Sequence, residues 1–71
     1  MRIVVNLDVM LARRKMRLKA LAQRIGLTEQ ALSMIKTNKV KGVRFDTLIK
    51  ICDALDCQPG DILEFVRDEG T

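Results

Sequence analysis

A single glycine interrupts the strongest helical pattern of the chain, the stretch ALAQRIGLTEQALSMIK at residues 20–36. Apolar side chains recur at helical spacing on both sides of it, at Leu21, Ala22, Ile25, Leu32 and Ile35. Gly26 can take the left-handed conformation that ends a helix without strain, and Thr28 can cap the helix that follows. The stretch therefore predicts two short helices, at about 18–25 and 28–37, that are joined by a tight turn.

Three further helices are predicted from the same kind of pattern. Apolar spacing indicates a first helix over about 7–16, with Asn6 as its N-cap, and a fourth helix over about 45–55. Pro59 suits the first position of a short fifth helix at 59–63. The apolar face of the fourth helix is predicted to consist of Phe45, Leu48, Ile51, Cys52 and Leu55.

Two short strand signals lie at opposite ends of the chain. Residues 2–6 are rich in β-branched side chains, and residues 63–67 continue a strand-like alternation. An isolated strand leaves backbone groups unpaired, so we expect the two to pair antiparallel. The patterns together predict an all-α fold of five helices with short paired terminal strands, as one domain over 1–71 with its core at 7–63. The free edge of this strand pair offers a second copy a place to bind, so we expect a homodimer.

Charge is distributed unevenly along the chain. Residues 1–45 carry eleven basic and two acidic side chains, a balance of +9, whereas residues 46–71 carry two basic and seven acidic ones, a balance of −5. The whole chain has a net charge of +4 and a sequence pI of about 9.5. A basic half of this kind favours a polyanionic partner such as nucleic acid, although a solvated basic surface would look the same.

Several function classes are disfavoured by what the sequence lacks. It has no histidine, and Cys52 and Cys57 are its two cysteines, so no zinc set is complete. We expect both cysteines to be buried reduced thiols; a disulfide would require the helix to end between them. Aromatic residues make up 3%, too few for a base-stacking platform. No glycine loop, paired-carboxylate pocket, signal peptide or membrane span is recognisable. We expect a cytoplasmic protein with no enzymatic activity, cofactor, metal or small-molecule ligand.

Three segments together resemble a known family. They are L-A-x-x-I-G-L-T at 21–28, L-S-x-I-K at 32–36 and T-L-x-K-I-C-x-A-L at 47–55. Over about residues 7–63 the chain resembles the lambda-repressor-like (Xre/Cro-type) helix-turn-helix family. With the segment DCQPGDILEFV at 56–66, it is similar to a small bacterial subgroup that is little more than the DNA-binding domain.

The resemblance implies a sequence-specific, double-stranded-DNA-binding transcriptional regulator. Its helix-turn-helix would span about 18–37, with the helix at about 28–37 in the major groove. The family's base-reading positions fall on Glu29, Gln30, Ser33 and Met34. Its backbone-contacting positions after that helix fall on Thr37, Lys39, Lys41 and Arg44, and we expect Arg17, Lys19 and Thr28 to contact phosphates as well.

Some positions depart from the family pattern and leave alternatives open. Arg17-Leu18 stands where the family often has Thr-Gln, whose glutamine helps fix the phosphate backbone, so this contact is either lost or taken over by Arg17 or Lys19. Met34 stands where a polar residue is common, and it either presses on a thymine methyl group or fills a gap in the core. The basic run at 13–15 is expected to be a solvated surface rather than a set of phosphate contacts. An interaction module or antitoxin-like protein, with another protein as its main partner, is the alternative function.

Overall fold

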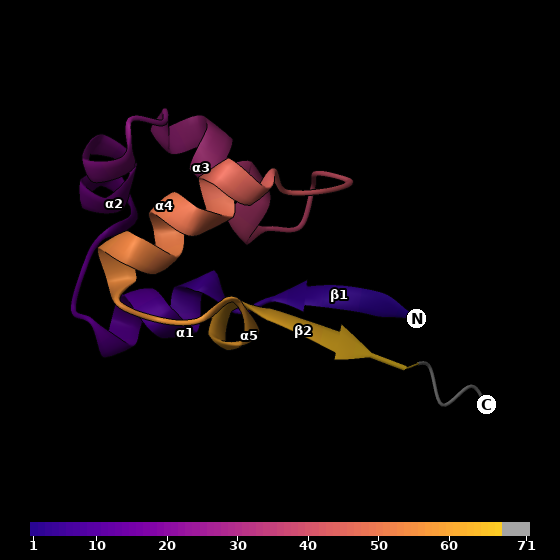
Figure 1. The fold of residues 1–71 in the computed structure, drawn as a ribbon. Helices are drawn as coiled ribbons and strands as arrows, with labels where there is room; N and C mark the ends of the chain where they lie inside the picture. Colours follow the sequence, from indigo (N-terminus) through magenta and orange to yellow (C-terminus); the bar gives the residue numbers. More distant parts are fainter. Residues whose placement is uncertain (68–71) are drawn as a thin grey trace.

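Five helices and two short strands make up this protein in the computed structural model, which describes residues 1–67. The elements are β1 (Arg2–Val5), α1 (Leu7–Arg13), α2 (Leu18–Ile25), α3 (Glu29–Lys36), α4 (Phe45–Leu55), α5 (Pro59–Ile62) and β2 (Leu63–Val66). Figure 1 shows the helices gathered around α4, with β1 and β2 side by side and extending away from them. The predicted five-helix fold with a terminal strand pair is confirmed. Within this described part, no helix is long and apolar enough to cross a membrane.

The turn between α2 and α3 is built as the sequence predicts. Gly26 has a φ of 78°, in the left-handed region, and its amide and that of Leu27 both bond to the carbonyl of Ala22. These bonds satisfy a carbonyl at the end of α2 that has no partner within the helix. Thr28 then caps α3, because its Oγ1 accepts a hydrogen bond of 3.0 Å from the amide of Ala31. Local chemistry alone therefore sets this turn.

Replacing Gly26 with alanine is expected to destabilise the protein by about 1–2 kcal/mol. A Cβ at this position would meet nothing within 4 Å, so the cost comes from the left-handed backbone alone. Gly42→Ala is the matched control, since Gly42 has no positive φ and equally open surroundings. Urea unfolding of both variants measures the difference. Equal losses of unfolding free energy would show that the backbone conformation of Gly26 is not the cause.

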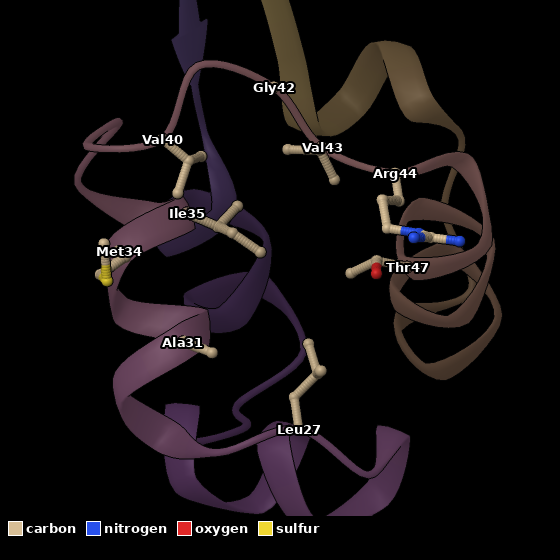
Figure 2. A pocket seen from close by; sticks show the side chains of 9 residues that line it. All are labelled: Leu27, Ala31, Met34, Ile35, Val40, Gly42, Val43, Arg44 and Thr47. Atoms are coloured by element: carbon tan, nitrogen blue, oxygen red, sulfur yellow. The ribbon is translucent and has the colours of Figure 1, made fainter.

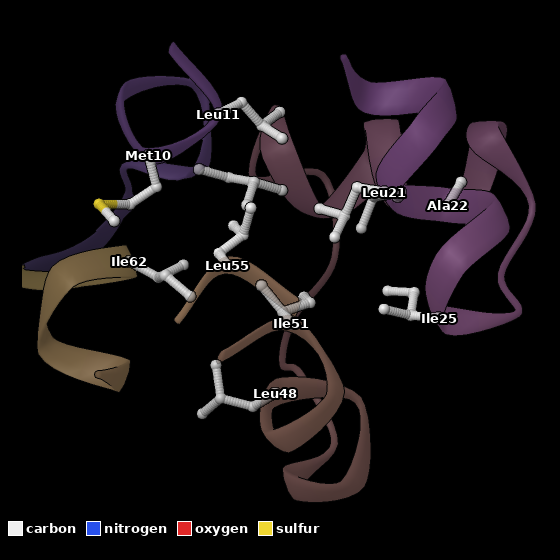
Figure 3. Close-up of a cluster of buried hydrophobic side chains, with 11 residues drawn as sticks. Met10, Leu11, Leu21, Ala22, Ile25, Leu48, Ile51, Leu55 and Ile62 are labelled. Atoms are coloured by element: carbon white, nitrogen blue, oxygen red, sulfur yellow. The ribbon is translucent and has the colours of Figure 1, made fainter. Parts of the chain in front are cut away.

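One hydrophobic core joins all five helices. Figure 3 shows side chains of α2 and α4 meeting those of α1 and α5 in a single cluster. The fully buried large side chains are Leu7, Leu21, Leu32, Ile51, Leu55 and Ile62. The prediction for Phe45 is wrong, because 82% of this residue is exposed although it was assigned to the apolar face of α4. Phe45 is the first residue of α4 and lies to one side of the buried row formed by Leu48, Ile51 and Leu55.

The end of α1 differs from the prediction. The helix stops at Arg13 rather than near residue 16, and Lys15 has a φ of 54°. Arg14 turns toward the end of α4, where its Nε donates to the carbonyl of Leu55 at 2.6 Å and its Nη2 to that of Asp56 at 2.9 Å. These carbonyls end a helix and attract a cation. Arg14 is thus a tertiary cap and not part of a merely solvated surface.

The N-cap prediction for α1 is correct in position and wrong in chemistry. Asn6 precedes the helix, but its side chain makes no capping bond. Its Nδ2 donates instead to Oε1 of Glu64 on β2, at 3.1 Å. The long-range partner is available because the two ends of the chain are paired, and this satisfies the amide in another way.

The two strands pair antiparallel, as expected. Ile3 lies opposite Phe65 and Val5 opposite Leu63, so these four side chains share one face of the sheet. Val5 and Leu63 pack against the helical core. Asn38, which has a φ of 61° just after α3, donates from Nδ2 to the carbonyl of Ile3 at 2.9 Å. The sheet is therefore anchored to the core on one face and to the end of α3 along one edge.

The two cysteines lie at the end of α4. Asp56 adopts the left-handed conformation with a φ of 50°, and the amide of Cys57 donates to the carbonyl of Cys52 at 3.1 Å. Both thiols are free and half-buried rather than buried. Burial raises the pKa of Cys57 to about 11, assisted by the nearby Cys52. The thiol of Cys57 therefore stays protonated near neutral pH and is a poor nucleophile.

Candidate nucleic-acid interface

The exposed side of α3 carries four residues that we call the reading face: Glu29, Gln30, Ser33 and Met34. Glu29, Gln30 and Met34 are exposed and Ser33 is half-buried, whereas Leu32 on the opposite side of the helix is completely buried. Within the described part of the chain, no hydrogen bond or ion pair engages the side chains of Glu29, Gln30 and Ser33. The structure therefore brings the four predicted residues together and leaves their polar groups available.

Contacts at both ends hold α3 in place. Thr28 caps its first turn, and Asn38 ties the residues after it to β1. Lys36, in the last turn, forms an ion pair with Asp8 of α1 at 3.5 Å, and its side chain is 28% exposed. Because Lys36 already has this partner, the basic side chains beside α3 to consider next are those of the loop that follows.

The loop between α3 and α4 carries the predicted cations Lys39, Lys41 and Arg44. All three are exposed, and within residues 1–67 no acidic side chain pairs with either lysine. Arg44 forms an ion pair with Asp46 at 3.2 Å, and this hydrogen bond lowers the pKa of the Asp46 carboxyl. Both groups are well exposed, so the pair is weak and can exchange for another anion. The loop therefore presents positive charge beside the reading face.

A hollow of about 240 Å³ separates α3 from this loop and the start of α4. In Figure 2, Leu27, Ile35 and Thr47 point into it, while Met34 lies on the outer side of α3. Met34 is 41% exposed, so it is not part of the buried core. One flank of Met34 borders the hollow and the rest faces outward with the reading face.

Thr28 and Thr37, both predicted to contact phosphates, differ in the hydrogen bonds that their hydroxyl groups already make. Oγ1 of Thr28 accepts from the amide of Ala31, which leaves its own hydrogen free to donate. Oγ1 of Thr37 donates back to the carbonyl of Ser33 at 2.9 Å. Thr28 can therefore donate to an external anion at once, whereas Thr37 must first give up a bond within α3.

A second basic region lies at the start of α2. Arg17 is the N-cap residue but forms no side-chain cap, so amides of the first turn have no side-chain partner there. Lys15, Arg17, Lys19 and Gln23 border a shallow hollow of about 410 Å³ at this end. The predicted pair Arg17 and Lys19 is thus brought together at a helix N-terminus, which attracts anions. The structure adds Lys15 and Gln23 to the residues that border this hollow, and the positive φ of Lys15 has no recognisable signal in the sequence.

Comparisons with known proteins agree with this geometry. The family model of the Cro/C1-type helix-turn-helix DNA-binding domain matches residues 6–68. The chain is 54% identical to YozG of Bacillus subtilis, named as an uncharacterised HTH-type transcriptional regulator, over 71 residues that cover all of this chain and 84% of YozG.

Two crystal structures share the fold. One is a Bacteroides fragilis protein named for proposed DNA binding, with a TM-score of 0.78 and 24% identity over 89% of this chain and all of that one. The other is the transcriptional regulator VanUg, with a TM-score of 0.75 and 26% identity over 94% of this chain and 88% of that one. The match of the family model to nearly the whole chain, supported by the YozG relative, shows that this protein belongs to the Cro/C1-type helix-turn-helix DNA-binding domain family.

Proposed function

We propose that this protein is a transcriptional regulator of the cytoplasm that binds double-stranded DNA in a sequence-specific manner, with α3 in the major groove. The observation that carries the proposal is the reading face, whose polar groups are uncommitted and are bordered by basic side chains. The major groove is wide enough for one helix and displays a distinct donor and acceptor pattern for each base pair. A role of this kind requires no catalytic group.

The four residues of the reading face suit different contacts. The amide of Gln30 can donate to N7 and accept from N6 of adenine, a bidentate contact. Ser33 can bond to a base or a phosphate, and Glu29 can accept from N4 of cytosine. Met34 offers apolar contact to a thymine methyl group from its exposed part. Glu29 is the least favourable member, because its charge is repelled by phosphates and already suits the first turn of α3.

The basic side chains are assigned to the phosphate backbone. Lys39, Lys41 and Arg44 would contact one strand beside α3, while Arg17 and Lys19 would hold a phosphate at the open N-terminus of α2. Thr28 can add a hydroxyl donor, and Thr37 can do so only by releasing its bond to Ser33. Such contacts fix the position of the protein on the duplex, and the reading face then selects the sequence.

Fluorescence anisotropy with a random duplex tests the proposal. We expect binding at 50 mM salt and a steep loss of affinity by 200 mM, because each neutralised phosphate releases a counterion. Selection of bound sequences from random duplex DNA would then give the length and symmetry of the site. An absence of binding at low salt would refute the proposal and favour a helix-turn-helix module that binds another protein.

Gln30→Ala is expected to relax the preference for one base pair by about 1–3 kcal/mol, the usual value of a bidentate contact. Competition between duplexes that differ at single positions measures this preference. Gln23→Ala is the matched control, since Gln23 is an exposed glutamine on α2 and outside the reading face. We expect Gln23→Ala to change the affinity for all duplexes by the same factor and so to leave the sequence preference unchanged. If Gln30→Ala also weakens every duplex equally, Gln30 does not read a base.

The proposed DNA-binding unit is a homodimer. Two copies related by a two-fold axis would place their α3 helices about 34 Å apart, one turn of DNA, on a palindromic site. A chain this short has a small core, and self-association is a common remedy. The terminal strands are one place where the second copy could bind, through the edge of the β1–β2 sheet.

A further inference from the structure

A row of apolar side chains lies exposed along α4. Phe45 is 82% exposed and Ile49 67% exposed, and Cys52 continues the row as a half-buried residue. The spacing of these three residues, i, i+4 and i+7, places them on one side of the helix, next to its buried face. We call this row the outer stripe. Isolated exposed apolar residues are normal, but a continuous row of large ones marks an interaction surface.

The outer stripe lies between two apolar hollows. A hollow of about 500 Å³ is bordered by Phe45, Ile49, Cys52 and Pro59. A second, of about 180 Å³, is bordered by Phe45 and by Ile3 on the sheet. Phe45 and Leu48 line both, so the apolar surface continues from α4 and α5 to the sheet. On that side of the sheet Ile3 is 45% exposed and its partner Phe65 54% exposed.

We propose that the outer stripe and the adjoining sheet face form the contact between two copies of this chain. This inference rests on the proposed homodimer and identifies its surface. A two-fold axis places the same patch of each copy against the other, so the patch must contain both a projection and a hollow. Here Phe45 is the projection and the 500 Å³ hollow beside Ile49 receives the Phe45 of the second copy.

The charges around the stripe favour the same arrangement. The N-terminal end of α4 follows Lys41 and Arg44, of which Asp46 balances one. The C-terminal end and α5 carry Asp53, Asp56 and Asp61, all of them exposed. A two-fold axis perpendicular to α4 makes the two α4 helices antiparallel, so the positive potential at the basic end of each copy lies toward the acidic end of the other, while the side chains of Lys41 and Arg44 keep their assignment to phosphates. Complementary charge of this kind sets the orientation of the pair.

The edge of the β1–β2 sheet is a less favourable surface for the contact between two copies than this face. The carbonyl of Ile3 on β1 already accepts a hydrogen bond from Asn38, at 2.9 Å, so that edge is partly occupied. β2 has four residues, which gives a short edge. A stable contact buries about 800 Å² on each partner, roughly 15% of the 5249 Å² surface of this chain. The proposed face draws on residues of α4, α5 and both strands, whereas the edge of β2 consists of four residues.

Analytical ultracentrifugation of Phe45→Glu tests the inference. We expect wild type to form a dimer at micromolar concentration, and the variant to raise the dissociation constant of the dimer at least about 100-fold, because the dimer would bury two carboxylates, one in the apolar hollow of each copy. Ile49→Glu is expected to act in the same way from the neighbouring turn. Val9→Glu is the matched control, since Val9 is a 47% exposed apolar residue on α1 and outside this face.

Circular dichroism establishes that each variant is folded, and the exposure of the replaced side chains makes this expected. A wild-type monomer at high micromolar concentration would overturn the inference. So would a dimer that persists in folded Phe45→Glu and Ile49→Glu, or a control variant that dissociates as readily as they do.

The proposed DNA binding is measured separately, by anisotropy of wild type with a random duplex. Wild type that binds duplex as a monomer would leave the regulator proposal intact and refute the contact surface. If the dimer is lost in Phe45→Glu but wild type shows no DNA binding, the contact surface is supported and the regulator proposal is refuted.

Discussion

Leu32→Ala is expected to lower the free energy of unfolding by about 2–5 kcal/mol, the usual cost of removing a buried leucine side chain. Leu32 is completely buried, and it is the buried residue by which α3 joins the core. A domain of this length has a total stability of roughly 4–11 kcal/mol. The substitution therefore removes a large part of it, and we expect a substantial unfolded population at 37 °C. Urea unfolding followed by circular dichroism measures the loss.

Met34→Ala provides the control on the same helix. It also removes a large apolar side chain, but Met34 is 41% exposed and borders an open hollow, so we expect a loss below about 1 kcal/mol. A similar loss for both variants would mean that α3 does not pack on the core through Leu32. DNA binding should behave differently: folded Met34→Ala is expected to keep its affinity for random duplex and to change its preference among sequences.

The second large effect, on the salt dependence of DNA affinity, is expected from the triple variant in which Lys39, Lys41 and Arg44 are each replaced by alanine. If each side chain neutralises one phosphate, the slope of log affinity against log salt falls by about 2.7, at 0.9 for each contact. Between 50 and 200 mM salt, wild-type affinity would then fall roughly 40-fold more than that of the variant. Anisotropy titrations with one random duplex at four salt concentrations measure both slopes.

A control with the same change in net charge separates local contacts from general attraction. Arg24, Lys50 and Arg67 can be replaced together, because they lie outside the loop between α3 and α4. Arg24 and Lys50 border a hollow with Asp53, and Arg67 lies 5.5 Å from the centre of the Phe65 ring. We expect this control to keep a slope close to that of wild type. Equal slopes for the two triple variants would show that the loop makes no specific phosphate contact.

Features that depend on a few neighbouring residues could be predicted from the sequence. Gly26 and Thr28 set the end of α2 and the start of α3 by bonds that span five residues or fewer. Apolar spacing likewise identified the buried sides of α2 and α3, and hence the reading face left outside. The terminal strand pair was predictable because two lone strands in a small chain have few other ways to satisfy their backbone groups.

Features that depend on distant partners could not be predicted. Arg14 is helical in its spacing, but its guanidinium bonds to carbonyls 41 and 42 residues away, and the chain leaves the helix there to reach them. Asn6 has the chemistry of an N-cap, yet its side chain makes no capping bond and its Nδ2 donates to Glu64, 58 residues away. Phe45 follows the apolar period of α4 and still lies outside the core, because the helix begins at the edge of the molecule. The apolar period identifies which side of a helix is buried, but it does not show how far along the helix the core extends.

The attachment of α3 at both ends has a consequence for the entropy of binding. The Thr28 cap, the Lys36–Asp8 pair and the bond from Asn38 to Ile3 fix the helix before any duplex arrives. The side chains that lose most conformational freedom on binding are then the long ones of the loop, Lys39 and Lys41, which would contact phosphates on any sequence. That loss is common to all duplexes, so it cancels when two of them are compared. It would weaken binding in general and would leave the ratio of affinities, on which recognition of one site among many depends, to the four residues proposed to read the bases.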